Sequence, residues 1–434
     1  MKNTIFLIFS IWSFALFSQI EDPFSIRYST KQKGNIKYLA NVSVFCDLAD
    51  TSCSNAAMDM PVTGTNPQDN NDFTAQYVDV DSDASTFMSS SDSLDLPLLS
   101  NILWAGLYWG ARINTATTNY SSRSNIKLSV NNNSYQDLTA DELIDFSGTT
   151  SYFCFKDITS IVQNNPINSR YSLANIVTQT GSPNRWGGWS IVIVYQNDTE
   201  SLRNLSVFDG LANVSQFGAG VNPNQVTIPI SGFLTPTSGP VSLELGIIAY
   251  EGDRQQTGDE LKFNGVNISD ALHNQTNVFN ATISNNETLT PHRNPNLNNT
   301  LGHDANIFIP DNSNYTYLAN NATSANVEIS TVGETIITQV ITTVIDDISS
   351  LNPNEYILNS VKVYPNPTSD IITLKGINSL TDVSYIHLLN NKGALIKKIG
   401  INETQIDLSS FSTGIYFIEI KHQLGSGRIK VVRQ

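Results

Sequence analysis

Short hydrophobic segments with alternating polar positions recur along most of the chain. Segments of this kind, rich in β-branched and aromatic residues and separated by clusters of Gly, Pro and Asn, are typical of antiparallel strands. Between residues 19 and 350 the clearest examples are 125–130, 189–195, 205–208, 225–230, 241–250 and 325–330. Two short segments instead favour a helix, residues 140–146 and residues 157–163, where Asp157 can cap the helix.

This pattern predicts an all-β fold, with two large antiparallel β-sandwich units of jelly-roll type. The first unit is expected at residues 19–220 and the second at 221–350, with the division in the Gly- and Asn-rich segment 218–224. The two units either fold independently or share an interface.

The strand pattern becomes denser near the C-terminus. Six short strands are expected there, at residues 361–364, 371–374, 385–389, 394–399, 415–420 and 429–432. An Asn- and Gly-containing turn at 390–393 joins two of them. We therefore predict a small immunoglobulin-like sandwich at 361–434, after a linker at 351–360.

The N-terminus has the pattern of an export signal. Lys2 is followed by an apolar run from Ile5 to Phe17 and then by the small and polar Ser18 and Gln19. One basic residue before an apolar run of about a dozen residues is typical of a secretory signal peptide. We predict a signal peptide at residues 1–18, cleaved between Ser18 and Gln19. No later run of about 20 apolar residues occurs, so the mature chain is predicted to lack a transmembrane segment.

Charge excludes one class of partner. The chain has 39 acidic and 24 basic residues, a net charge of -15 and an isoelectric point near 4.6. Such a chain repels phosphate backbones, so nucleic-acid binding is not expected. The C-terminal region departs from this balance, because residues 361–434 contain nine basic and five acidic residues. The change in charge supports a domain boundary there.

The three cysteines agree with export. Cys46 and Cys53 enclose a short polar segment, which a disulfide could close in an oxidising compartment. Closing a loop of this size would stabilise the fold by about 2–3 kcal/mol. Cys154 lies in an aromatic, strand-like segment and is expected to be a small buried hydrophobic residue.

Three separated motifs in the C-terminal region identify a family. They comprise residues 363–370 with Tyr364, Pro365, Asn366 and Pro367, residues 407–417 with Gly414 and Tyr416, and a basic end with Lys430 and Arg433. Over about residues 355–434 they resemble the type A C-terminal sorting domain of the type IX secretion system. The resemblance implies Sec export, passage through the type IX translocon and cleavage by a sortase-like enzyme that anchors or releases the passenger. It also implies a source in the Bacteroidota.

The region before this domain, the passenger, also has a familiar order of segments. They are residues 78–87, 104–110, 186–192, 207–210, 251–259 and 301–305. Together they resemble an uncharacterised extracellular domain at the front of large bacterial surface proteins. The resemblance implies a location at the cell surface and supplies no catalytic residue.

Two acidic groups are candidate sites. Asp79, Asp81 and Asp83 have the spacing of the first three ligands of a calcium loop, but Ala84 and Ser90 replace the Gly and Glu that an EF-hand requires. If the segment is a strand, the three carboxylates share one face. They would then either bind Ca²⁺ or form a solvated acidic edge that prevents edge pairing.

The second group lies in a Gly-rich loop after the strand 241–250. It contains the acidic residues Glu251, Asp253, Asp259 and Glu260, with Arg254 among them. A Ca²⁺ site or a carbohydrate site is compatible with such a loop at the end of a sandwich. A glycosidase would need two carboxylates about 5–10 Å apart beside a sugar cleft.

The remaining candidates favour structure over chemistry. Trp104, Trp109, Trp186 and Trp189 could stack on sugars, but their strand-like spacing favours core packing. His303 and Asp304 are adjacent on a predicted strand and should point to opposite faces.

No catalytic motif is present. We predict a non-enzymatic adhesion or ligand-binding module for a surface glycan or a host or matrix ligand, which binds either with or without the help of Ca²⁺. The alternatives are a secreted polysaccharide hydrolase and a carbohydrate-binding module.

Overall fold

The computed structural model describes residues 20–59, 68–146, 150–215, 224–347, 361–377, 383–422 and 425–434. Strands dominate these ranges, which confirms the predicted all-β class. The predicted signal peptide with its cleavage site at Ser18 and Gln19 lies outside them, as does the predicted linker at 351–360. No helix in the described ranges is both long and apolar enough to cross a membrane.

Strand β1 (Ile20–Val42) joins the two halves of an 11-stranded sheet in the passenger, and we call these halves the two large sheets. Residues 20–33 pair antiparallel with β12 (Leu202–Ser215), and residues 34–42 pair antiparallel with β11 (Gly187–Gln196). A Cβ atom at Gly34, where the partner changes, would lie 2.0 Å from the backbone oxygen of Tyr195. Only glycine allows the two backbones to approach this closely.

The two large sheets face each other across a central core. The first continues from β11 through β5 (Asn101–Arg112), β9 (Ser151–Asp157) and β8 (Glu142–Asp145). The second continues from β12 through β21 (Thr335–Asp346), β14 (Leu243–Tyr250), β19 (His303–Phe308), β17 (Ile283–Asn285) and β18 (Thr288–Leu289). Their facing side chains include the large aromatic residues Trp104, Tyr108, Phe153, Trp186 and Tyr250.

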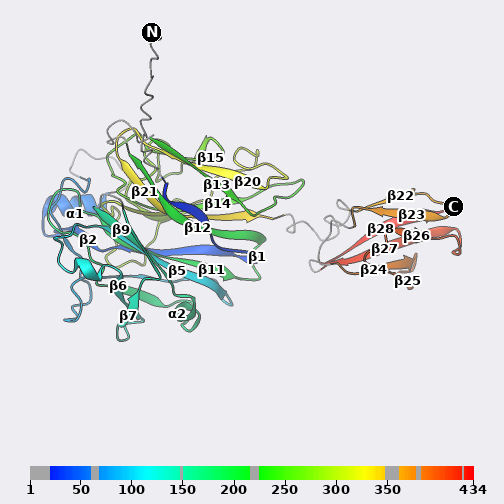
Figure 1. The fold of residues 1–434 in the computed structure, drawn as a ribbon, viewed down its shortest axis with the longest axis horizontal. Helices are drawn as coiled ribbons and strands as arrows, with labels where there is room; N and C mark the ends of the chain where they lie inside the picture. Colours follow the sequence, from blue (N-terminus) through cyan, green and yellow to red (C-terminus); the bar gives the residue numbers. More distant parts are fainter. Residues whose placement is uncertain are drawn as a thin grey trace, which may run out of the picture.

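A smaller sheet covers the outer face of each large sheet, so the passenger has four layers (Figure 1). The first outer sheet has the order β4 (Ser89–Ser93), β10 (Arg170–Ala174), β6 (Asn125–Val130) and β7 (Gln136–Thr139). The second has the order β13 (Gln225–Ser231), β20 (Ser324–Ser330), β15 (Glu260–Phe263) and β16 (Val266–Asn267). Each outer sheet encloses a further apolar core with the large sheet beneath it.

The layers explain the hydrophobic patterns. Strand β13 alternates between exposed and buried residues because one of its faces meets solvent. Strand β11 is buried along nearly its whole length because it has a core on each side.

Strand pairing joins the regions on either side of the predicted division. The predicted division at 218–224 falls, except for Asn224, outside the described residues. On either side of it, β12 pairs with β21 over most of its length. The regions 19–220 and 221–350 therefore share an interface.

The helices are few and short. Helix α2 (Thr159–Gln163) confirms the second predicted helix, and Asp157 Oδ1 accepts a hydrogen bond from Thr159 N at 2.8 Å. The predicted helix at 140–146 is wrong: β8 lies there, because its backbone pairs with β9. Helix α1 (Thr51–Met58) was not expected. It lies in the chain between β2 (Val44–Cys46) and β3 (Ala75–Tyr77), which pair in a short sheet. The chain also has a 3-10 helix, η1 (Tyr120–Ser122).

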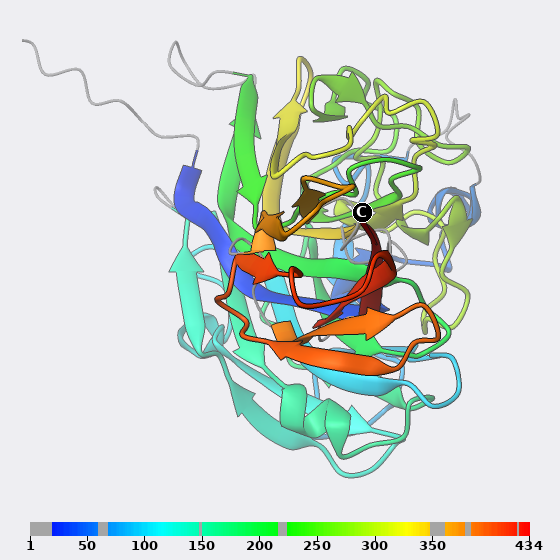
Figure 2. The same cartoon turned by 90° about the vertical axis from the view of Figure 1, so that its right-hand side faces the viewer.

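The C-terminal region forms the expected small sandwich, which lies in front in Figure 2. One sheet contains β22 (Lys362–Tyr364), β23 (Ile371–Lys375) and β26 (Gln405–Asp407). The other contains β25 (Leu395–Ile399), β24 (Val383–Asn390), β27 (Gly414–His422) and β28 (Gly425–Arg433). Between the sheets lies an apolar core of its own, which includes Ile372, Ile386 and Ile418.

Candidate ligand-binding pocket

The segment from Asp79 to Asp83 is a loop with a single β-bridge between Asp79 and Ser89, and it does not form the strand on which both alternatives depended. Ser82 has a left-handed backbone conformation, with φ of 58°, which turns the chain. The carboxylates accept local hydrogen bonds: Asp79 from Ser89 Oγ at 2.8 Å, Asp81 from Asp83 N at 2.9 Å, and Asp83 from Ser85 N at 2.8 Å. Aspartate commonly stabilises turns in this way. The three carboxylates therefore do not form a row on one strand face.

Two of these carboxylates line a cavity of about 390 Å³, which we call the polar pocket. Its lining consists of Val80, Asp81, Asp83, Ser129, Asn132, Asn133, Tyr135 and Ser172. Ser129 of β6 and Ser172 of β10 are direct partners in the first outer sheet, so they lie on the same face. Their neighbours Leu128 and Leu173 point into the core on the other face. The pocket therefore lies on the outer face of this sheet, beneath the loop that carries Asp81 and Asp83.

Hydrogen bonds fix Asp81 in the pocket wall. It accepts from the hydroxyl of Tyr135 and, at 3.3 Å, from Thr86 Oγ1, in addition to the backbone of Asp83. Partial burial would raise the pKa of Asp81, but these hydrogen bonds outweigh it, and the pKa lies below its usual value. The pKa of Tyr135 is raised by burial and by the neighbouring carboxylate. At neutral pH the pocket therefore contains an ionised Asp81 beside a neutral tyrosine.

Other polar groups of the pocket are free. The hydroxyl of Ser172 has no hydrogen-bond partner within the described parts of the chain, although the residue is only 8% exposed. Asn132 and Asn133 are exposed, and their side-chain amides make no hydrogen bond to described residues. One oxygen of Asp83 is likewise without a described donor. These groups are available to a ligand.

The second acidic group is buried elsewhere. Asp259 Oδ2 accepts from the backbone N–H groups of Val278 at 2.6 Å and Phe279 at 2.7 Å. Asp253 donates its backbone N–H to Glu334 Oε2 at 2.8 Å. Sequence reasoning missed Glu334, which stands alone before β21 and reaches this group only through the fold. Glu260, in contrast, pairs with Lys262 at 2.7 Å near the surface.

Burial dominates the electrostatics of this group. It raises the pKa of Asp253 to about 8, with further contributions from the negative charges of Asp69 and Glu251. The pKa of Glu251 is raised to about 7, and that of Glu334 is raised by burial and by Asp259. Carboxyl groups this buried lie out of reach of a large substrate.

No convergent metal site is present in the described ranges, where no three His, Cys, Asp or Glu side chains are grouped to hold an ion. The structure does not bring Asp79, Asp81 and Asp83 together with Asp253 and Asp259. Calcium binding by either group stays a prediction.

The histidines lie in structural networks. As expected, His303 and Asp304 point apart: His303 Nε2 contacts Ser190 Oγ at 3.2 Å, and Asp304 Oδ1 accepts from Thr282 N at 3.1 Å. Burial lowers the pKa of His303 to about 4. His303 is therefore neutral at physiological pH.

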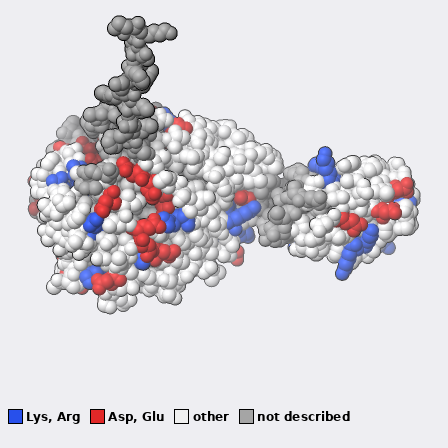
Figure 3. All heavy atoms as spheres, in the orientation of Figure 1, with Lys and Arg blue, Asp and Glu red and all other residues white. Residues whose placement is uncertain are grey.

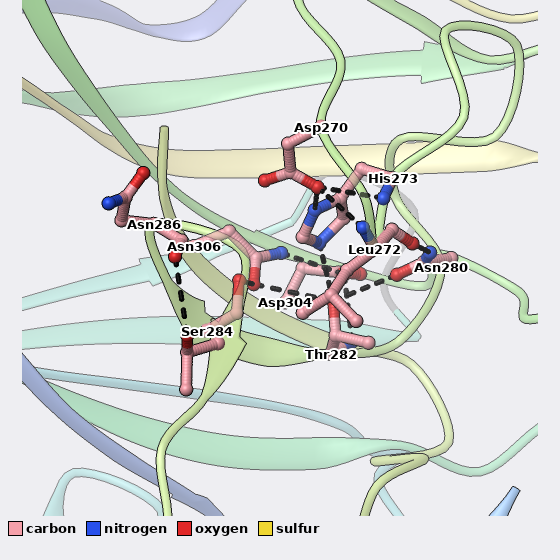
Figure 4. A network of polar contacts seen from close by, with 10 residues as sticks. Asp270, Leu272, His273, Asn280, Thr282, Ser284, Asn286, Asp304 and Asn306 are labelled. Carbon is pink, nitrogen blue, oxygen red and sulfur yellow. Dashed lines mark hydrogen bonds and ion pairs between the residues drawn. The ribbon is translucent and has the colours of Figure 1, made fainter. Parts of the chain in front are cut away.

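Figure 4 shows an arrangement that resembles a catalytic triad. His273 Nδ1 lies 2.7 Å from Asp270 Oδ1, and His273 Nε2 lies 2.8 Å from Thr282 Oγ1. However, His273 is 0% and Thr282 2% exposed, and Thr282 Oγ1 also contacts Asn280 Oδ1 at 2.8 Å. With no open face for a substrate, the network serves to hold the 270–282 segment in place.

The tryptophans are buried, which confirms core packing and excludes them as sugar platforms. Trp109 and Trp189 are 0% exposed, and Trp186 and Trp104 are nearly as buried. Trp189 packs between β11 and the first outer sheet, where its Nε1 donates to Ser90 Oγ at 2.9 Å.

Two of the three cysteines are joined by a disulfide. Cys46 and Cys53 form a disulfide with a Cα–Cα distance of 5.9 Å, which ties β2 to α1. Cys154 is buried and free.

The sorting motif is part of the C-terminal sandwich. Asn366 joins the Pro-rich loop to β28: its Nδ2 donates to Lys430 O at 2.7 Å, and its Oδ1 accepts from Val432 N at 2.9 Å. Tyr364 and Pro365 precede it and are exposed, and Pro367 follows it. Tyr416 of β27 donates its hydroxyl to the backbone oxygen of Ser412, in the loop before this strand, at 2.7 Å. The Pro-rich segment and the basic C-terminal segment, which are far apart in the sequence, are therefore in contact.

Charged side chains of both signs are interspersed on the surface in Figure 3, and much of this face carries neither. No continuous basic stripe of the kind that binds nucleic acid is visible on the drawn part of this face.

Comparison with known proteins identifies the C-terminal domain. Residues 362–434 match the secretion system C-terminal sorting domain, which confirms the predicted type IX sorting domain. No curated protein sequence is significantly similar to the chain.

Similarity to solved structures is distant. A peptide-N(4)-(N-acetyl-β-D-glucosaminyl) asparagine amidase is 10% identical, over 60% of this chain and 90% of the amidase, with a TM-score of 0.19. Dimeric latent PorU from Porphyromonas gingivalis is 8% identical, over 74% of this chain and 30% of PorU, with a TM-score of 0.19. Neither similarity supports a conclusion about function.

Proposed function

We propose that the passenger is a non-enzymatic binding module that attaches to an extracellular ligand at the polar pocket. The sorting domain at residues 362–434 directs the chain through type IX secretion to the cell surface or the exterior. It thereby brings the chain into contact with the secretion machinery. A sortase-like enzyme that anchors or releases the passenger, and a source in the Bacteroidota, belong to the same proposal.

The polar pocket is the observation that supports binding. Its volume of about 390 Å³ lies within the range of about 300–1,000 Å³ that is typical of small-molecule sites. Its free hydroxyl, amide and carboxylate groups converge on one space, and the hydrogen bonds of Asp81 hold one wall in place. A preformed wall reduces the ordering cost of binding.

Hydrolysis is the weaker alternative for this pocket. A glycosidase needs a protonated acid near neutral pH beside a second carboxylate. Asp81 is unsuited to be that acid, because its pKa lies below the usual value. The carboxyl groups with raised pKa values, such as Asp253 and Glu251, are buried at another site.

A binding assay with product analysis tests this proposal. The purified full chain is applied to immobilised surface polysaccharides and matrix proteins, and each bound ligand is recovered and sized after prolonged incubation. We expect saturable binding of at least one ligand, recovered at its original length. Shortened polysaccharide with release of reducing ends would contradict a non-enzymatic role.

Calcium assistance is tested separately by thermal unfolding, first with excess EDTA and then with millimolar Ca²⁺. At about 100 Kd, an ion bound by the folded state alone adds roughly 2.7 kcal/mol to stability. An upward shift that Asp81→Asn abolishes would support a calcium-assisted pocket. An unchanged midpoint would show that the pocket acts without calcium.

A further inference from the structure

We infer that the ligand of the polar pocket is an uncharged glycan, and that the pocket discriminates against acidic sugars. This inference rests on the proposed binding function and specifies its ligand class. Four features of the pocket support it: the unpartnered serine at its floor, the free amides at its rim, the sign of its charge and the polar character of most of its lining residues.

The floor of the pocket contains a polar group that lacks a partner. Ser172 is more than nine-tenths buried, lines the cavity, and has no hydrogen bond from its hydroxyl within the described ranges. A ligand that fills the cavity would displace the water at this hydroxyl, and leaving the hydroxyl unpartnered would then cost about 1–3 kcal/mol. A ligand hydroxyl that both donates and accepts would satisfy it.

The rim of the pocket has the same kind of chemistry. Asn131 and Asn132 have left-handed backbone conformations, with φ of 55° and 59°, and this turn places the free amides of Asn132 and Asn133 at the pocket. Each amide offers two N–H donors and one oxygen acceptor. Adjacent hydroxyls on a sugar ring, which are also both donors and acceptors, match this mixture better than a ligand of one polarity.

Charge determines which sugars fit. Asp81 and Asp83 line the pocket, and no Lys, Arg or His is among its lining residues. An ionised carboxylate accepts hydrogen bonds from ligand hydroxyls strongly. The same two charges repel a uronate, sialate, sulfate or phosphate group, and none of the lining residues carries a positive charge that would offset the repulsion.

Apolar ligands are disfavoured for a complementary reason. Val80 and the ring of Tyr135 provide the apolar contacts, whereas the other lining residues are polar or charged. A lipid or an aromatic compound would therefore bury the pocket's polar groups without giving them hydrogen bonds. A sugar ring can instead place its C–H face on Tyr135 and its hydroxyls on Ser172 and the amides.

The first experiment uses the full-length protein on an array of uncharged, amino, uronic, sialylated and sulfated glycans, followed by calorimetry with the strongest ligand. We expect binding to uncharged glycans and none to the acidic series. Ser172→Ala should weaken binding about three- to tenfold, the value of one hydrogen bond. Its thermal midpoint should not fall, because the hydroxyl has no partner in the protein.

Asp83→Asn supplies the test of charge, with Asp311→Asn as its matched control. Asp83 and Asp311 are both exposed, and each accepts a hydrogen bond from the backbone two residues later, at 2.8 and 2.9 Å. We expect Asp83→Asn to weaken the binding of uncharged glycans and to allow the binding of acidic ones. Asp311→Asn should change neither affinity. Asn132→Gly should also weaken binding, whereas Asn321→Gly, at an exposed asparagine with the same φ of 59°, should not.

The outcomes separate this inference from the proposed function. Equal binding of acidic glycans, or unchanged affinity in both Ser172→Ala and Asp83→Asn, overturns the glycan pocket. If the protein binds a matrix protein saturably but binds no glycan, the inference that the ligand is a glycan is wrong, whereas the proposal of a binding module stands. Failure to bind any glycan or matrix protein overturns both.

Discussion

Glu251→Gln should make the protein less sensitive to alkaline pH, because it removes a carboxylate that ionises at high cost in the fold. Glu251 is 8% exposed and accepts a hydrogen bond from Asn184 Nδ2 at 2.7 Å through one oxygen, while its other oxygen lacks a partner within the described ranges. Burial raises the pKa of Glu251 from 4.5 to about 7, although Asn184 and Arg112 act in the opposite direction. Glutamine has the same shape, can accept from Asn184 and does not ionise.

The direction and the size of this pH effect on stability follow from proton linkage. The folded protein holds this proton more tightly than the unfolded chain does. The resulting stability is therefore fully present below about pH 4.5 and is lost as the pH rises through about 7. A difference of about 2.5 pKa units at about 1.36 kcal/mol per unit corresponds to about 3 kcal/mol. Between pH 4.5 and 8, the native protein should lose about that much more stability than Glu251→Gln.

Denaturant unfolding of the full chain at several pH values, with tryptophan fluorescence to follow the passenger, measures this difference. Glu287→Gln, at an exposed glutamate, is the control and should keep the native pH dependence. The reasoning would be refuted if stability changed equally with pH in Glu251→Gln and in the native chain, or if the variant were less stable than the native chain at pH 8.

Three further predictions concern the disulfide, the core and the sorting domain. Replacing Cys46 and Cys53 together by Ser should lower the free energy of unfolding by about 2–3 kcal/mol, as measured by denaturant unfolding against the native protein under oxidising conditions. An unchanged midpoint would show that the bond adds nothing. Trp189→Ala should cost about 3–5 kcal/mol, because the indole is fully buried; a loss below 1 kcal/mol would contradict its place in the core. Asn366→Ala should remove two hydrogen bonds to β28 and so reduce protection of the Val432 amide in hydrogen exchange and lower the exported fraction. Native protection and native export in that variant would rule out the role given to Asn366.

Much of the fold was predictable because its strands carry a strong local pattern. Outer-sheet strands such as β6 and β20 match the predicted segments almost residue by residue, since one face meets solvent and the alternation is clear. Strand β1 was missed, because residues 20–33 are largely polar and extend only through pairing with β12. The helix predicted at residues 140–146 is wrong for a similar reason, because pairing with β9 overrides the helical composition of this segment.

The candidate site was predictable only in part. The spacing of Asp81 and Asp83 marked them, yet their loop uses the carboxylates in turns and not as a calcium row. Ser172 and Ser129 could not be found, since they meet only through the register of two strands about 40 residues apart. The consecutive asparagines at 131–133 were a second local signal, because asparagine tolerates the left-handed conformation that forms the rim.

Amide hydrogen exchange of the full chain, with and without a saturating uncharged glycan, tests the binding pocket most directly. The account predicts slower exchange in three segments that are distant in sequence, residues 79–87, 129–135 and 170–174, with little change around the buried acids at 251–259. Protection confined to 251–259, or none in the three pocket segments despite measured binding, would contradict it.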